Sequence, residues 1–298
     1  MAAVMDISYV CSLGLPVHVP AKTSKALLAE ALQVAKPVQS LETTQDVGVA
    51  GQVDPPLQSS AAASKPLYMD ATYVFQCQSS IEHSKLSEDG QALLVQLNQT
   101  VFHPQGGGQP TDIGRLLADG VPPLDVVFVS KDKVDQSTIW HECRGDVQHW
   151  LGKKGLEVTC VVDDARRRLC ARLHSAGHLL DVAMMAAGFR WKPGKGYHFP
   201  DGPYVEYLPS EEGRQVDLKD TKAKELVLQE LASKMKELID RNVPTGIGYV
   251  DGTRTITMDG VACGCGGTHV EFSGEIGEVT IKKIQSKQGN IRVSYALA

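Results

Sequence analysis

The feature of this sequence that most constrains its fold is a change in hydrophobic period near residue 164. Between residues 67 and 164, β-branched and aromatic residues occur in short runs separated by Gly, Pro and Asp, a pattern typical of strands joined by turns. From Leu169 to Met184, apolar residues instead recur at helical spacing, and a second helical stripe extends from about Leu218 to Arg241. The change predicts an α+β chain in which a small N-terminal β-barrel-like domain precedes an α+β domain.

The domain boundaries follow from the same patterns. We predict the barrel-like domain at residues 67–164 and the α+β domain at residues 165–298. Residues 1–66 are predicted to be an extension, largely disordered or linker, because they end in a stretch rich in Gly, Pro, Ser and Ala. Strands of the second domain are predicted at Tyr204–Leu208, Gly277–Ile284 and Ile291–Leu297.

Composition restricts where such a chain works. The sequence holds no run of about 18 apolar residues free of charge, which a membrane-spanning helix would need. Its 7 cysteines are spread thinly over 298 residues and form no disulfide framework, which indicates a reducing compartment. Residues 1–65 carry acidic residues and no Arg, unlike a mitochondrial targeting peptide. We therefore expect a cytoplasmic protein.

Two pairs of side chains predict a zinc site. His174 and His178 stand four residues apart on the first predicted helix, so both imidazoles project from one face. In Cys265-Gly266-Gly267-Thr268-His269, a glycine pair can fold tightly enough to bring a thiolate and an imidazole to the same cation. One Cys with three His suits zinc. The alternatives are a Gly-rich turn with a buried thiol and a capping histidine, or Cys263 as the ligand in place of Cys265.

The spacing also restricts the chemistry. Ser175 follows His174, so the glutamate of a His-Glu-x-x-His metalloprotease is missing. Gly177 costs roughly 1 kcal/mol relative to Ala in a helix interior, which favours close packing or ligand access beside the histidines. Four protein ligands usually close a zinc site and make it structural, whereas a catalytic zinc keeps one position open. Either one ligand is displaced in the active state, or the zinc expands its coordination.

Three blocks of the sequence together resemble the editing domain of alanyl-tRNA synthetase, the second additional domain shared with threonyl-tRNA synthetase, and its free-standing AlaX-type relatives. The blocks are Phe102–Gly114 with its three consecutive glycines, Arg172–Leu180, and Cys265–Val270 followed by Gly274–Gly277. Their order and separation match the family from about residue 67 to residue 298, and residues 1–65 have no counterpart in it.

The resemblance implies a zinc-dependent hydrolase that deacylates mischarged tRNA(Ala), chiefly Ser-tRNA(Ala) and next Gly-tRNA(Ala). The zinc ligands it implies are His174, His178, Cys265 and His269. It further implies that the loop of Gly106, Gly107 and Gly108 leans over the zinc pocket. Gln109 and Thr111 would then contact the aminoacyl group, although an ordinary turn hydroxyl is the alternative for Thr111.

Basic residues in the second domain could meet RNA phosphates. The candidates are Arg166, Arg167, Arg168, Lys192, Lys195, Lys282 and Lys283. The chain has a formal net charge of -5, yet residues 165–298 carry more basic than acidic residues, which favours an anionic partner for this part. A solvated surface is the alternative for each cluster. His198 either faces the pocket or is a structural histidine with satisfied hydrogen bonds.

Three functions are compatible with these residues. The leading hypothesis is a trans-editing enzyme that hydrolyses the ester bond of mischarged tRNA(Ala). The second is a catalytically inactive, zinc-stabilised tRNA-binding module. The third is a metallohydrolase that acts on another small ester and does not need the tRNA body.

Overall fold

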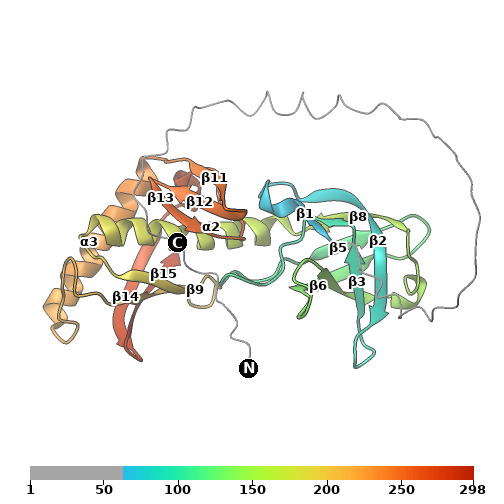
Figure 1. The fold of residues 1–298 in the computed structure, drawn as a ribbon, viewed down its shortest axis with the longest axis horizontal. Coiled ribbons are helices and arrows are strands. Elements are labelled where there is room, and N and C mark those ends of the chain that lie inside the picture. Colours follow the sequence, from blue (N-terminus) through green and yellow to red (C-terminus); the bar gives the residue numbers. More distant parts are fainter. Residues whose placement is uncertain (1–62) are drawn as a thin grey trace, which may run out of the picture. The chain divides into compact units, whose positions relative to one another are not determined.

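The structure, a computed structural model, describes residues 63–298 (Figure 1). Most of the predicted extension, residues 1–66, therefore lies outside the described residues. Its end is strand β1 (Lys65–Pro66), which pairs in parallel with β4 (Gln99–Thr100).

A closed antiparallel barrel forms the first part of the described chain and confirms the predicted barrel-like fold. Its strands follow the order β2-β3-β7-β6-β5-β8, so each strand has two neighbours and no backbone edge stays open. Alternate residues enter the core, as Val158, Cys160 and Val162 do in β8. The strands are β2 (Gln76–Leu86), β3 (Leu93–Leu97), β5 (Gly114–Leu117), β6 (Leu124–Lys131), β7 (Ile139–Gly145) and β8 (Glu157–Val162), with short 3-10 helices η1 (Leu67–Met69) and η2 (Val147–His149).

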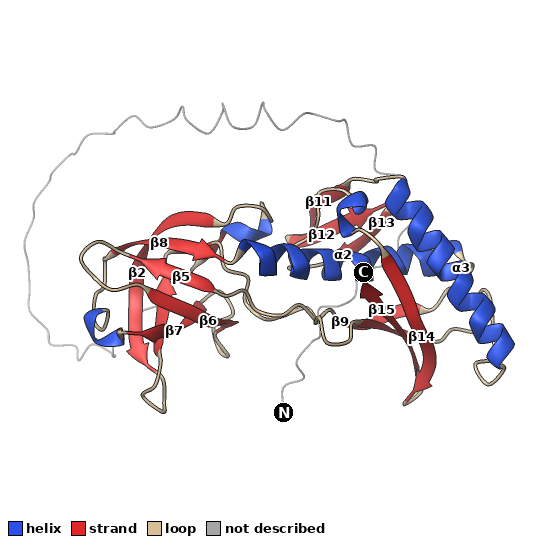
Figure 2. Cartoon of the chain, turned by 180° about the vertical axis from the view of Figure 1, so that it is seen from behind, coloured by secondary structure: helices blue, strands red, loops and turns tan. Residues whose placement is uncertain are grey.

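Two α-helices occupy the predicted helical regions (Figure 2). Helix α2 (Asp164–Ala186) begins where the Asp163 carboxylate accepts a hydrogen bond from the Arg166 N–H at 2.9 Å, and Gly188, at a φ of 88°, follows its end. Helix α3 (Thr221–Asp240) is capped in the same way by Asp220. Its buried residues are Val227, Leu231, Met235 and Leu238, the face that the stripe predicts.

Two further antiparallel sheets accompany the helices. The larger has the strand order β14-β15-β10-β9 and contains the three predicted strands, while β9 and the smaller sheet, β11-β12-β13, are not predicted by the sequence patterns. The bounds are β9 (Lys192–Tyr197), β10 (Tyr204–Leu208), β11 (Thr245–Val250), β12 (Thr253–Met258), β13 (Val261–Gly264), β14 (Val279–Lys287) and β15 (Asn290–Leu297), with a 3-10 helix η3 (Ser273–Ile276).

The second hydrophobic core lies between the helices and the larger sheet. Leu180 of α2 and Leu231 of α3 share it with Val205 of β10 and Val293 of β15. This packing fixes the rotation of α2 and with it the direction of its histidines. Among the described residues, no helix is both long and apolar enough to cross a membrane.

Candidate metal centre

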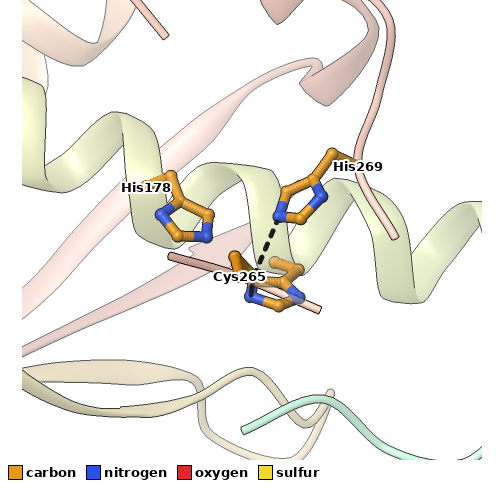
Figure 3. Close-up of side chains that lie close together, drawn as sticks. His178, Cys265 and His269 are labelled. Atoms are coloured by element: carbon orange, nitrogen blue, oxygen red, sulfur yellow. Dashed lines mark hydrogen bonds between the residues drawn. The ribbon is translucent and has the colours of Figure 1, made fainter. Parts of the chain in front are cut away.

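Four side chains that are distant in sequence converge at one point. The potential ligand atoms of His174, His178, Cys265 and His269 all lie within 4.8 Å of one another. Figure 3 shows His178 from helix α2 beside Cys265 and His269 from the loop after β13. The structure therefore brings together the four residues that the sequence singles out, and Cys263 is not among them.

The helix supplies two of the four side chains. The rings of His174 and His178 stack with their centroids 5.0 Å apart, as expected for residues one turn apart. The loop supplies the other two. Its Cys265 Sγ lies 3.4 Å from His174 Nε2 and 3.5 Å from His269 Nε2, so the sulfur and two imidazole nitrogens face each other.

The ligand atoms of the four side chains are better suited to binding a cation than to hydrogen-bonding one another. His178 Nε2 is buried and has no hydrogen-bond partner among the described residues. Such an orphaned buried nitrogen is costly unless a ligand satisfies it. Thiolate sulfur and neutral imidazole nitrogen are the donors that zinc and related transition metals prefer. The residues present could therefore hold a metal ion.

Burial keeps the imidazoles neutral, as metal ligation requires. It lowers the pKa of His178 to about 4, and burial with the neighbouring histidines holds the pKa of His174 and His269 well below the usual value. Burial raises the pKa of the Cys265 thiol to about 11, opposed by the Gly267 N–H and by Arg254. A bound cation would reverse this shift, since a coordinating thiol is deprotonated.

Arg254 is a residue of the site that sequence reasoning missed. Its side chain is buried in β12, and its Nη1 donates hydrogen bonds to the carbonyl oxygens of Cys265, at 2.6 Å, and Gly267, at 3.1 Å. The Arg254 carbonyl in turn accepts from the Cys265 N–H. Arg254 thus fixes the loop that carries two of the clustered side chains. Its only sequence signal is an arginine between threonines in an alternating run.

His198 packs against the cluster. Its ring stacks on His174 with centroids 4.5 Å apart, and its Nδ1 lies 2.7 Å from the Tyr295 hydroxyl. Tyr295 gives its own proton to the Leu173 carbonyl, so Nδ1 of His198 must be the donor to the tyrosine oxygen. His198 therefore faces the site and is also hydrogen-bonded. A Cβ at Gly177 would collide with this ring, which explains a glycine within the helix.

The glycine-rich loop is a tight turn. Gly106 and Gln109 exchange two backbone hydrogen bonds across Gly107 and Gly108, whose φ angles are 57° and 78°. Positive φ at both central positions is a conformation that glycine adopts more readily than any other residue. The Gly108 carbonyl accepts from the His198 N–H at 2.8 Å, and a Cβ at Gly108 would collide with the Gly196 carbonyl. The loop therefore reaches the cluster region.

Gln109 and Thr111 are both buried. The Gln109 amide forms hydrogen bonds with His174, one of the four clustered side chains, and with Thr268, the neighbour of His269. The Thr111 hydroxyl donates to the Asp112 carbonyl and accepts from the Val129 N–H, within the barrel. This bonding favours the alternative of a structural hydroxyl for Thr111, and contact with an aminoacyl group stays a prediction for both residues.

One of the predicted RNA-binding residues is placed differently from the prediction. Arg167 is 0% exposed and forms an ion pair with Asp112, while its Nη1 donates to the Thr72 carbonyl at 2.8 Å. The prediction that Arg167 meets RNA is therefore wrong, because its guanidinium is enclosed and each of its nitrogens is hydrogen-bonded within the protein. Arg167 lies seven residues before His174, on the buried face of the same helix.

The other basic residues lie nearer the surface. Arg166 is partly buried and bonds to the Thr111 carbonyl, and Arg168 is exposed, paired with Asp164 and placed over the rings of Tyr73 and Phe75. The four lysines predicted to meet RNA are exposed and lie on the two edge strands of the larger sheet, Lys192 and Lys195 on β9 and Lys282 and Lys283 on β14.

Comparisons with known proteins identify the family of the chain. A scan against protein-family models finds none that matches the chain. The alanyl-tRNA editing protein AlaX-M of Methanosarcina barkeri is 30% identical over 254 residues, which cover 78% of this chain and 99% of that protein. The chain belongs to the AlaX family of alanyl-tRNA editing proteins.

The AlaX chain is also similar to alanine–tRNA ligases. That of Methanobrevibacter smithii is 29% identical over 230 residues, which cover 71% of this chain and 24% of the ligase. That of Korarchaeum cryptofilum is 31% identical over 219 residues, covering 67% of this chain and 23% of the ligase. The AlaX chain thus spans only about a quarter of the length of the curated ligases that it matches.

Proposed function

We propose that this AlaX protein is a zinc-dependent trans-editing hydrolase that deacylates mischarged tRNA(Ala), chiefly Ser-tRNA(Ala) and next Gly-tRNA(Ala). The observation that carries the proposal is the convergence of His174, His178, Cys265 and His269 within 4.8 Å, in a chain whose relatives include an alanyl-tRNA editing protein. We assign residues 67–164 to a barrel domain and residues 165–298 to the zinc-binding editing domain.

The four clustered residues would be the ligands, and zinc is the metal that one thiolate and three imidazoles favour. When bound, zinc supplies Lewis-acid polarisation of an ester carbonyl or of a water molecule. His178 and Cys265 are only partly buried, whereas His174 and His269 are buried. Solvent and substrate would therefore approach from the side of His178 and Cys265. This exposure supports a coordination position of the proposed zinc that can open on that side.

Two further residues of the site, Arg254 and His198, would stabilise the thiolate and fix the position of a proton. Arg254 keeps the loop of Cys265 and His269 in position and places a cation near the thiolate, which favours the ionised sulfur. His198 keeps its proton on Nδ1, toward Tyr295, so that its Nε2 has a free lone pair. An aminoacyl ester is already activated, so this set needs less general-base help than an amide would require.

The RNA partner would be tRNA(Ala), met by exposed basic residues. We propose Arg166, Arg168, Lys192, Lys195, Lys282 and Lys283 for phosphate contacts and leave out the enclosed Arg167. The cytoplasm is the compartment we propose, because the substrate is a translation intermediate and the clustered thiol needs to stay reduced.

Deacylation assays test the proposal directly. Purified protein, loaded with zinc, is incubated with Ser-, Gly- and Ala-charged tRNA(Ala), and His174→Ala serves as the metal-site variant. We expect release of serine and glycine, retention of alanine, and loss of both activities in the variant. RNA binding without any deacylation would favour the inactive module, and equal hydrolysis of a small serine ester without tRNA would favour a general esterase.

A further inference from the structure

The side chain of Gln109 makes three hydrogen bonds although it comes from the barrel loop. Its Oε1 lies 2.7 Å from His174 Nδ1 and accepts from the Thr268 N–H at 3.0 Å. Its Nε2 donates to the Thr268 hydroxyl at 2.8 Å. Gln109 is 0% exposed, so these bonds are shielded from water. One amide thus joins the helix of His174 to the loop of Cys265 and His269.

The orientation of this amide is determined by Thr268. A backbone N–H can only donate, so the atom of Gln109 that faces it must be the oxygen. The same oxygen faces His174 Nδ1, which must therefore carry the proton and donate it. The other ring nitrogen, Nε2, then keeps its lone pair, and it is this nitrogen that lies 3.4 Å from Cys265 Sγ.

The position of Gln109 is itself fixed from both sides. On the barrel side, the turn through Gly107 and Gly108 is clamped to the end of β9 by the hydrogen bond from the His198 N–H. On the other side, a Cβ at Gly267 would collide with the His174 ring and would lie 2.8 Å from Gln109 Oε1. The amide therefore extends from an anchored turn and lies close to the backbone of Gly267.

We propose that Gln109 is a positioning residue of the metal centre, which sets the tautomer and ring orientation of His174 and anchors the Thr268 loop. Both lone pairs of its oxygen and one of its two N–H groups are engaged with His174 and Thr268, so its bonds are made chiefly to the site itself. The inference rests on the proposed function, since it presupposes a cation among the four clustered residues. Partners of this kind typically change metal affinity by about 10- to 100-fold when they are lost.

Metal binding by the full chain tests the proposal without measuring activity. Gln109→Leu keeps the volume and removes all three hydrogen bonds, whereas Gln109→Glu keeps an acceptor toward both His174 and the Thr268 N–H. Zinc affinity is measured by competition with a chromophoric chelator, and the ligand field by the visible spectrum of the cobalt-substituted protein. Gln105→Leu, at an exposed position of the same loop, is the matched control.

We expect Gln109→Leu to weaken zinc binding by about 10- to 100-fold and to alter the cobalt spectrum. Gln109→Glu and Gln105→Leu should stay within about 3-fold of the wild type, a change well below that range. Wild-type zinc affinity and spectrum in Gln109→Leu, with altered discrimination between serine and alanine, would overturn the proposal in favour of substrate contact. Equal losses in Gln109→Leu and Gln109→Glu would also overturn it, since the retained acceptor would then not matter.

A parallel measurement on His174→Ala distinguishes a failure of the Gln109 role from a failure of the metal site. Loss of zinc in His174→Ala with normal binding in Gln109→Leu removes only the role of Gln109. Normal zinc binding in His174→Ala removes the metal site, and the proposed function fails with it.

Discussion

Asp112 and Arg167 form an ion pair in which both side chains are 0% exposed. Asp112 belongs to the barrel loop that carries the glycines, and Arg167 to the first turns of helix α2. The Arg167 Nε lies 3.1 Å and 3.0 Å from the two carboxylate oxygens, and one of these oxygens also accepts from the His103 N–H. The pair therefore ties the glycine-rich loop to the helix that bears His174 and His178.

Removing one member of this pair should be strongly destabilising. Asp112→Asn leaves the Arg167 charge buried without its partner, and we expect a loss of about 3–5 kcal/mol in the free energy of unfolding. Asp125→Asn is the matched control, because the Asp125–Arg115 pair is 66% and 65% exposed and should contribute at most about 1 kcal/mol. Urea unfolding of both variants measures the difference, and equal losses would contradict the assignment.

Two neighbouring glycines should respond differently to alanine. Gly107→Ala faces only the strain of positive φ, about 1–2 kcal/mol, because no atom lies within 4 Å of its added Cβ. Gly108→Ala faces the same strain and a collision with the backbone of Gly196. We therefore expect the larger loss of stability, and weaker zinc binding, from Gly108→Ala. The prediction fails if thermal unfolding ranks the two variants in the opposite order.

Metal removal should lower stability only when the cluster is intact. A ligand at 100 times its dissociation constant stabilises the folded state by about 2.7 kcal/mol, so a chelator should lower the Tm of the zinc-loaded wild type. His178→Ala removes the orphaned Nε2 and should make the Tm insensitive to the chelator. His149→Ala, at an exposed contact with Asp146, should keep the wild-type response. A chelator effect retained in His178→Ala would argue against this site.

Acid should destabilise the barrel through His141. Burial lowers the pKa of His141 to about 4 from the ordinary 6.5, so between these values the unfolded chain binds a proton that the folded chain excludes. The stability is then fully present above pH 6.5 and is lost as the pH falls toward 4. Between pH 7.5 and pH 5, the metal-free wild type should lose about 2 kcal/mol more than His141→Gln. Urea unfolding at the two pH values compares them, and parallel losses would contradict the assignment.

The proposed phosphate contacts predict a salt dependence. Each lost contact should reduce the slope of log affinity against log salt concentration by about 0.7–0.9. We expect this change for Lys195→Gln and for Lys283→Gln in tRNA(Ala) binding. Lys133→Gln, an exposed lysine on the barrel, is the control and should leave the slope unchanged. Identical slopes in all three variants would support a solvated surface instead.

Local sequence patterns were sufficient to predict the helices and strands whose apolar residues recur at a regular spacing. The strand at Tyr204–Leu208 and the apolar stripe of α3 both reflect burial of one face, and both predictions are confirmed. The sheet β11-β12-β13 escaped prediction because β11 consists of Thr, Gly and mostly exposed residues, so burial imposes no clear alternation on it. Its position depends on pairing with β12 instead.

The candidate site likewise contains residues that local patterns predict and residues that depend on long-range contacts. The convergence of His174 and His178 follows from helix geometry, and the glycine pair accounts for Cys265 and His269. The bonds of Gln109 join positions 65 and 159 residues apart, which no local period encodes. Arg167 stands seven positions before His174, so it could have been predicted to lie on the same buried face of the helix. The arginines on either side of it made that face hard to recognise.

The four clustered side chains come from two chain segments, helix α2 and the loop after β13, which have tertiary packing between them. An unfolded chain can offer a cation only one pair at a time, either two imidazoles or a thiolate with one imidazole. If the cluster binds the proposed cation, metal content after purification would measure how many molecules have completed their tertiary structure. Leakage of the ion under mild stress would report local separation of these two segments before the helices themselves melt.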